Sequence, residues 1–277
     1  MLSMLKLLST LILLTSILNA DINEDKILKF EKTRLAKNPQ ITIKSVDIAM
    51  KKKLDQEGWY GVVFNVVAQL QGKTVKAKDT LFTNGKITTP ELYNIKTGKS
   101  YKDVMKPKLT QKYYNDEHLI AGNKNAKHKI VLFSDPLCPF CIEYSPELIK
   151  DVKNNPNKFA LYYYHFPLLG LHPDSNIITK AMLVASKMGI KDVTYKTYTA
   201  DFYKYLTEHK NSDEKVLKIF NKVMKTNITM DQINSKDIQK SIEHDIFMGE
   251  EAMVQGTPTV FFDGVYDKSR YKYDRIK

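Results

Sequence analysis

The stretch FSDPLCPFCIEYSPEL, residues 133–148, contains both cysteines of a 277-residue chain. Only Pro139 and Phe140 separate Cys138 from Cys141. Two cysteines so close in sequence rarely serve to staple a fold, and a chain of this length can build a sufficient core without one. Their spacing therefore indicates redox chemistry rather than stabilisation.

The flanking sequence predicts a strand, a helix and a second strand. Residues 130–133 form a short apolar run, a helix is expected to start at the cysteines, and residues 159–166 form another buried strand. The tyrosines at 162–164 are expected to pack in the core, on alternating faces of that second strand. A strand–helix–strand unit implies a parallel pair of strands. A Cys-x-x-Cys motif in this context is typical of a thioredoxin-like redox site.

The position of the motif gives the two sulfurs different roles. Cys138 would lie at the N-terminus of the helix, where the free amides of Phe140 and Cys141 and the helix dipole stabilise a thiolate. Such sites lower a thiol pKa from about 8.5 to roughly 3.5–7.5. Cys138 is therefore predicted to be the exposed attacking sulfur. Cys141, one turn further on, is predicted to stay a shielded thiol that resolves the mixed disulfide.

Metal binding is the competing use of a Cys-x-x-Cys motif. Zinc requires four ligands, and the chain has no second pair of cysteines. The nearest downstream histidines, His165 and His172, do not supply a zinc-finger spacing. We therefore expect neither a metal nor another cofactor, and we interpret both histidines as structural.

Two prolines extend the pattern around the cysteines. Pro146 lies five residues after Cys141, inside the expected helix. Far along the chain, residues 256–259 read Gly-Thr-Pro-Thr and precede a strand and an Asp-Gly turn. A proline at the start of a strand is a candidate for a cis peptide bond.

Together these motifs resemble the thioredoxin superfamily, and most closely the bacterial periplasmic Dsb proteins. VLFSDPLCPFC, residues 131–141, is similar to the active-site strand and loop of DsbC and especially DsbG. YYYHFPLLGLHPDS, residues 162–175, followed by helices, resembles the strand and helical insertion of DsbA and DsbC relatives.

The resemblance implies a redox-active Cys138–Cys141 disulfide, with Cys138 as nucleophile. It also implies that Pro258 is a cis-proline facing this disulfide and that Thr257 presents backbone groups to a bound peptide. Pro139 and Phe140 would shape the turn that directs amides at Cys138.

Other positions either match the Dsb pattern or depart from it. Asp135 matches an acidic position of these proteins, and a loop cap is an equal interpretation. Leu132 stands where DsbA has a carboxylate, and no histidine lies between the cysteines. Phe140 is apolar and cannot stabilise a thiolate by charge, which argues against a very strong oxidant.

The N-terminus has the pattern of a cleavable signal peptide. Residues 1–20 contain one charge at Lys6, an apolar run over 7–18, and the small residue Ala20. The run is short for a membrane span, although a retained anchor is the alternative interpretation. We therefore expect export to the periplasm of a Gram-negative bacterium.

The remaining patterns define domains and a fold class. Residues 21–95 contain one helical stretch and then strand-like stretches, which predicts a small α+β domain. Its place in the chain resembles the cystatin-like dimerisation domain of DsbC and DsbG. Residues 96–112 are expected to be a linker. Residues 113–277 are expected to form a thioredoxin-like catalytic domain with a helical insertion at 172–253. The predicted fold class is α/β (α+β), a thioredoxin fold with a helical insertion.

Charge and motifs narrow the function. The net charge of +12 comes from lysines spread along the chain, and no nucleic-acid motif accompanies them. We predict an exported thiol-disulfide oxidoreductase that forms or isomerises disulfides in exported proteins that carry cysteines. A membrane redox partner would reoxidise or reduce it, and a homodimer would favour isomerisation. The alternatives are a periplasmic chaperone with secondary redox activity, and a metal-binding or purely structural module.

Overall fold

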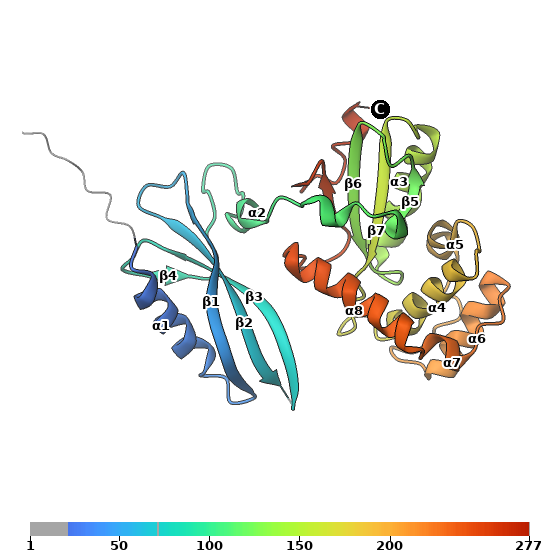
Figure 1. Ribbon diagram of the computed structural model, residues 1–277, viewed down its shortest axis with the longest axis horizontal. Helices are drawn as coiled ribbons and strands as arrows, with labels where there is room; N and C mark the ends of the chain where they lie inside the picture. The colour runs from blue at the N-terminus through green and yellow to red at the C-terminus, as the bar shows by residue number, and fades with distance from the viewer. Residues whose placement is uncertain (1–21, 71, 277) are drawn as a thin grey trace, which may run out of the picture.

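The computed structural model describes residues 22–70 and 72–276. The predictions for residues 1–20 therefore lie outside the described residues. Within the described part of the chain, no helix is both long enough and apolar enough to cross a membrane. Figure 1 shows an N-terminal unit and a C-terminal unit joined by the segment that carries α2.

The N-terminal unit is one helix packed on a four-stranded antiparallel sheet, in the strand order β1-β2-β3-β4. Its elements are α1 (Glu24–Leu35), β1 (Ile41–Lys53), β2 (Tyr60–Leu70), β3 (Lys73–Thr83) and β4 (Thr88–Thr89). The strand β2 is apolar on both faces. Val62 and Phe64 pack toward α1, whereas Val63 packs on the opposite side of the sheet. This α+β unit agrees with the predicted fold class.

The segment 96–112, expected to be a linker, partly packs on the N-terminal sheet. It contains the short helix α2 (Lys102–Met105). Tyr101 and Met105 are buried in one apolar cluster with residues of the sheet and with Met253, which follows α8. This cluster joins the two units at the C-terminal end of α8.

The C-terminal unit contains a five-stranded sheet in the order β5-β7-β6-β8-β9. Its strands are β5 (Leu119–Gly122), β6 (His128–Ser134), β7 (Phe159–His165), β8 (Thr259–Phe262) and β9 (Val265–Tyr266). β6 and β7 are parallel and are connected by α3 (Pro139–Asn154), while the other neighbours are antiparallel. The unit is a thioredoxin-like α/β domain, and the predicted strand–helix–strand unit is confirmed.

Helices cover both faces of this sheet (Figure 1). They are α4 (Ser175–Lys187), α5 (Val193–Thr199), α6 (Asp213–Met224), α7 (Met230–Ile233) and α8 (Lys236–Glu251), with short 3-10 turns at Gln111–Tyr113, Asp116–His118 and Asp274–Ile276. Tyr163 of β7 packs with α3, α4 and α5. Its neighbours Tyr162 and Tyr164 pack on the opposite face, with α8. The tyrosine run is therefore core, as predicted.

Gly122 is the last residue of the edge strand β5 and pairs with Ala160 of β7. It has φ +79°, and a Cβ atom there would lie 1.9 Å from the carbonyl oxygen of Phe159 and 3.0 Å from Val152. A side chain at this position would therefore face both an unfavourable backbone conformation and a clash with backbone that cannot move aside.

We predict that Gly122→Ala lowers the free energy of unfolding by roughly 3 kcal/mol, because overpacking and a positive φ both oppose the methyl group. The matched control is Gly98→Ala. Gly98 has φ +65° with open space around it, so its loss should be about 1 kcal/mol. Denaturant titration followed by circular dichroism measures both losses. Equal losses would show that the contact with Phe159 contributes nothing.

Candidate active site

The start of α3 places the two cysteines. Cys138 is the N-cap residue, with an extended backbone, and Pro139 occupies the first helical position, where no N–H is required. The amide of Cys141 donates to the carbonyl of Cys138 at 2.9 Å, which closes the first turn. The side chain of Phe140 points outward and is 65% exposed. Helix α3 then continues through Pro146.

Hydrogen bonds converge on the sulfur of Cys138 and lower its pKa to about 5. The largest cause is the hydrogen bond from the Cys141 thiol, and partial burial opposes it. The hydroxyl of Thr257 and the backbone amides of Cys141 and Phe140 lower the pKa further. Cys138 is therefore a thiolate at neutral pH, although no charged side chain contributes.

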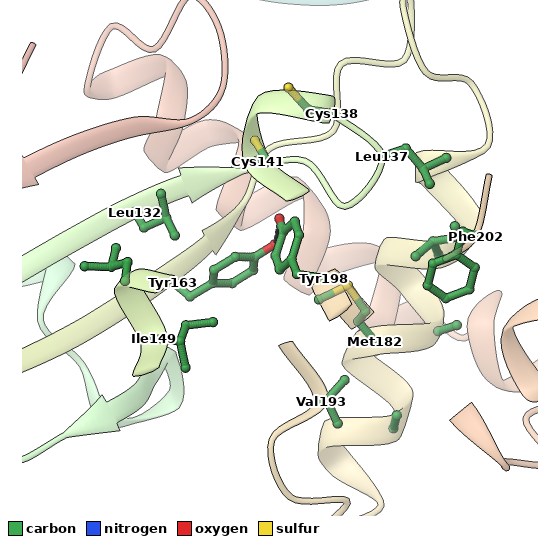
Figure 2. Close-up of a cluster of buried hydrophobic side chains, with 14 of the residues drawn as sticks. Leu132, Leu137, Cys138, Cys141, Ile149, Tyr163, Met182, Val193, Tyr198 and Phe202 are labelled. Atoms are coloured by element: carbon green, nitrogen blue, oxygen red, sulfur yellow. Dashed lines mark hydrogen bonds between the residues drawn. The ribbon is translucent and has the colours of Figure 1, made fainter. Parts of the chain in front are cut away.

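The second sulfur has the opposite environment. Cys141 is fully buried, and this burial raises its pKa above the usual range, with the hydrogen bond to Cys138 acting in the same direction. Figure 2 shows the sulfur of Cys138 at the outer edge of the helix start and that of Cys141 nearer to the buried cluster. Both are free thiols in this structure. The difference in pKa separates a reactive sulfur from a protected one.

The segment between α8 and β8 closes over Cys138. The Thr257–Pro258 peptide bond is cis, and the carbonyl oxygen of Thr257 lies 3.4 Å from the sulfur of Cys138. The hydroxyl of Thr257 is buried and makes no hydrogen bond among the described residues, so it is available to donate to the thiolate when Cys138 is charged. The expectation of an exposed Cys138 is wrong, because this segment leaves the residue only 4% exposed.

A buried carboxylate fixes the loop that carries the first cysteine. Asp135 is completely buried and accepts hydrogen bonds from the amides of Leu137 and Leu168, both at 2.8 Å. His172 Nδ1 and the Ser175 hydroxyl contact the same carboxylate at 2.9 and 2.5 Å. Asp135 thus caps its own loop and ties it to the segment that precedes α4. His172 is one of the partners that hold this loop.

Apolar side chains are exposed near Cys138. The loop before α3 and the loop before α4 meet at Asp135, which accepts from the amides of Leu137 and Leu168. The hydroxyl of Tyr203 also contacts this region, because it donates to the carbonyl of Leu137. The exposed apolar side chains here are Phe140 on the first turn of α3, Leu169 and Leu171 on the loop before α4, and Tyr203 between α5 and α6. An apolar surface of this kind beside a reactive sulfur suits the binding of an unfolded polypeptide.

A cavity of about 680 Å³ lies elsewhere, between α4, α8 and β7. Its lining includes His118, Tyr163, His165, His244 and Asp245, and neither cysteine. Burial alone would raise the pKa of Asp245, but hydrogen bonds from His118 and His165 hold it at about 2. Among the described residues, no three or more His, Cys, Asp or Glu side chains are grouped so that they could hold a metal ion. The reactive sulfur, and not this cavity, therefore marks the candidate site.

The structure brings together all six residues predicted for the site: Cys138, Pro139, Phe140, Cys141, Thr257 and Pro258. Their catalytic and substrate-binding roles remain predictions. The sequence did not indicate the Thr257 hydroxyl, nor Ser134, whose hydroxyl contacts Cys141. A serine or threonine side chain gives no signal of this kind until its distant partner is known.

Comparison with known proteins places this domain in a family. A family model described as Thioredoxin matches residues 114–277. No curated protein matches the chain. A solved thioredoxin-like oxidoreductase from Silicibacter pomeroyi DSS-3 is 19% identical, with a TM-score of 0.47, over 60% of this chain and 96% of that one. ScsC of Proteus mirabilis in a compact conformation is 20% identical, with a TM-score of 0.44, over 57% of this chain and 74% of that one. DsbA2 of Pseudomonas aeruginosa is 18% identical, with a TM-score of 0.39, over 55% of this chain and 89% of that one.

We predict that Thr257→Val raises the pKa of Cys138 by about 1, because the thiolate loses a charge-assisted hydrogen bond. The pH dependence of Cys138 alkylation by iodoacetamide measures this. The wild-type rate should rise with pH to half its maximum near pH 5 and stay level above pH 7. Thr257→Ser keeps the hydroxyl and is the control. The same midpoint in the valine and serine variants would exclude a role for the hydroxyl.

Proposed function

Because the chain belongs to the thioredoxin family of thiol-disulfide oxidoreductases, we propose that it forms or isomerises disulfide bonds in exported proteins through Cys138 and Cys141. The observation that supports this most directly is the pair of sulfurs at the start of α3. One has a lowered pKa and lies against a cis-proline segment, while the other is buried behind it. The chemistry needs no cofactor beyond these two thiols.

The proposed reaction is a pair of thiol-disulfide exchanges. A substrate thiolate attacks Cys138 in the oxidised protein, the bond between Cys138 and Cys141 breaks, and the electron pair goes to the sulfur of Cys141. A second substrate thiolate then attacks the substrate sulfur of this mixed disulfide, and Cys138 leaves as a thiolate. The pKa of about 5 makes Cys138 a good leaving group, which favours donation of the disulfide to the substrate.

The finer assignment extends the resemblance to periplasmic Dsb proteins of the DsbC and DsbG type. An N-terminal α+β unit ahead of the catalytic domain and a signal-like sequence at residues 1–20 support it. In this proposal the protein acts in the periplasm of a Gram-negative bacterium. Its substrates are exported proteins with cysteines, and a membrane redox partner resets Cys138 and Cys141.

We predict that Cys138→Ala abolishes both insulin reduction and the refolding of scrambled ribonuclease, because the attacking sulfur is lost. Cys141→Ala is the informative partner variant. It keeps the attacking sulfur but cannot resolve, so it should accumulate a mixed disulfide with substrate, detectable by mass spectrometry. A wild-type protein inactive in both assays, with a disulfide that glutathione does not reduce, would exclude the proposed function and favour a structural role.

A chaperone role is the second candidate, and the exposed apolar side chains around Cys138 favour it. The discriminating variant is Cys138→Ala with Cys141→Ala, which has no thiol chemistry. If it suppresses client aggregation as well as the wild type does, while the wild type shows little exchange, peptide binding is the main activity. Loss of suppression together with loss of the thiols would instead tie binding to exchange.

The proposed homodimer is supported by the edge of the N-terminal sheet. β1 is a 13-residue strand that lies at the edge of this sheet. An unpaired edge of this length can pair with a second copy of the chain. We predict that the full chain sediments at twice its monomer mass at micromolar concentration. A monomer at that concentration would remove the preference for isomerisation over simple oxidation.

A further inference from the structure

The environment of Cys141 lacks the charged group that its chemistry would use. During exchange this sulfur carries negative charge in a fully buried position, which is costly without a partner. Leu132, also fully buried, stands at the position where DsbA has a carboxylate. The groups whose hydrogen bonds favour a charged Cys141 are instead neutral, the backbone at Asp135 and the Ser134 hydroxyl.

Behind Ser134 lies a chain of buried hydroxyls. The hydroxyl of Tyr198 donates to Ser134 Oγ at 2.6 Å, and the hydroxyls of Tyr163 and Tyr198 lie 2.9 Å apart. Tyr163 comes from β7, Tyr198 from α5, and Ser134 from the end of β6. Figure 2 shows the two phenol oxygens meeting beneath Cys141. Three separate elements therefore bring their hydroxyls to one side of this sulfur.

The direction of these hydrogen bonds is informative. Because Tyr198 donates to Ser134 Oγ, the proton of Ser134 is left to point elsewhere. Its two neighbours are Cys141 and the Ser145 hydroxyl, the latter at the long distance of 3.3 Å. Burial raises the pKa of both tyrosines well above the usual value, so they remain protonated donors. Each donor in such a chain strengthens the next one.

We propose that the hydroxyl chain Ser134–Tyr198–Tyr163 stabilises the developing thiolate of Cys141, in place of a charged residue. This inference rests on the proposed function. When a thiolate attacks Cys138, the Cys138–Cys141 bond breaks and its electron pair moves to Cys141, where Ser134 donates a hydrogen bond. The thiolate of Cys141 then takes a proton from water. In the reverse step Cys141 loses its proton to water, attacks Cys138 and expels the other sulfur.

This role differs measurably from that of a chain which merely satisfies buried polar groups. A hydrogen bond that is strongest when Cys141 is charged lowers the barrier in both directions. It leaves the balance between disulfide and mixed disulfide nearly unchanged, since Cys141 is neutral in both of these end states. A structural defect would instead shift that balance or the stability of the fold.

The experiment uses glutathione and the full-length protein. The rate constant for attack of glutathione on the oxidised protein and that for expulsion of glutathione from the mixed disulfide are measured by acid quench and mass spectrometry. We expect both to fall about 10-fold in Ser134→Ala and a few-fold in Tyr198→Phe, with their ratio unchanged within about two-fold. Tyr163→Phe should have a smaller effect in the same direction.

Tyr144→Phe is the matched control. Tyr144 is a buried tyrosine of the same core, but its hydroxyl donates to the backbone carbonyl of Arg270 and is not part of the hydroxyl chain Ser134–Tyr198–Tyr163. Both of its rate constants should stay within about two-fold of the wild type. If Ser134→Ala does not fold, Tyr198→Phe, which keeps the ring, decides the question, and Tyr163→Phe decides it if Tyr198→Phe also fails.

Three results would overturn the inference while leaving the proposed function intact. The first is a Tyr198→Phe protein with wild-type rate constants. The second is a Tyr144→Phe protein that is slowed as much as Tyr198→Phe. The third is a variant in which only one of the two rate constants falls, so that their ratio changes by the full amount. An oxidised wild-type protein that does not react with glutathione would instead be a failure of the proposed function. The two failures are therefore distinguishable.

Discussion

Helix α3 begins directly after the loop that leaves β6, and the residue at which it begins decides what each sulfur can do. The N-cap position gives Cys138 the unpaired amides of the first turn. The position three residues later carries Cys141 to the buried side of the same turn. A helix that started one residue later or earlier would turn both sulfurs by about 100° around its axis, so neither environment would survive. The rest of the domain supports this one helix start.

The thiolate of Cys138 is stabilised without a nearby cation. Phe140 contributes only its backbone amide, because its side chain is apolar and points to solvent. The hydrogen bonds from Cys141 and Thr257 act in place of a charged neighbour. The apolar side chain of Phe140 is therefore only one part of the environment that sets the pKa of Cys138. Neutral donors gathered from two distant segments can have the effect of one charge when they are pre-positioned.

Local sequence was sufficient for the parts of the fold that are local. The spacing of Cys138 and Cys141 after an apolar strand predicted a helix start, a parallel strand pair and unequal sulfurs. The parts that could not be predicted depend on contacts across the chain. The burial of Cys138 comes from Thr257, 119 residues away, and the environment of Cys141 comes partly from Tyr198 on α5. Nothing in the sequence around Ser134, at the end of a strand, or around Tyr198, in a short helix, indicates that their hydroxyls are hydrogen-bonded.

The cis Thr257–Pro258 bond could be predicted only by combining two distant parts of the sequence. Proline at a strand start is common, and the isomer could be expected only because Cys-x-x-Cys occurs in the same chain. The segment that leads to it begins near Met253, which is held in the apolar cluster shared with the N-terminal unit. Both ends of this short segment are therefore anchored, one by β8 and one by the contact between the units.

The buried carboxylate of Asp135 has a consequence for the thermodynamics of substrate binding. Four donors from two loops meet on its oxygens, so both loops lose their conformational entropy when the protein folds. A polypeptide that settles on these loops does not have to order them again, and less of its binding free energy is spent on immobilising the surface. Under the proposed function, the weak, sequence-independent contacts of an unfolded substrate would then suffice to hold it near the sulfur.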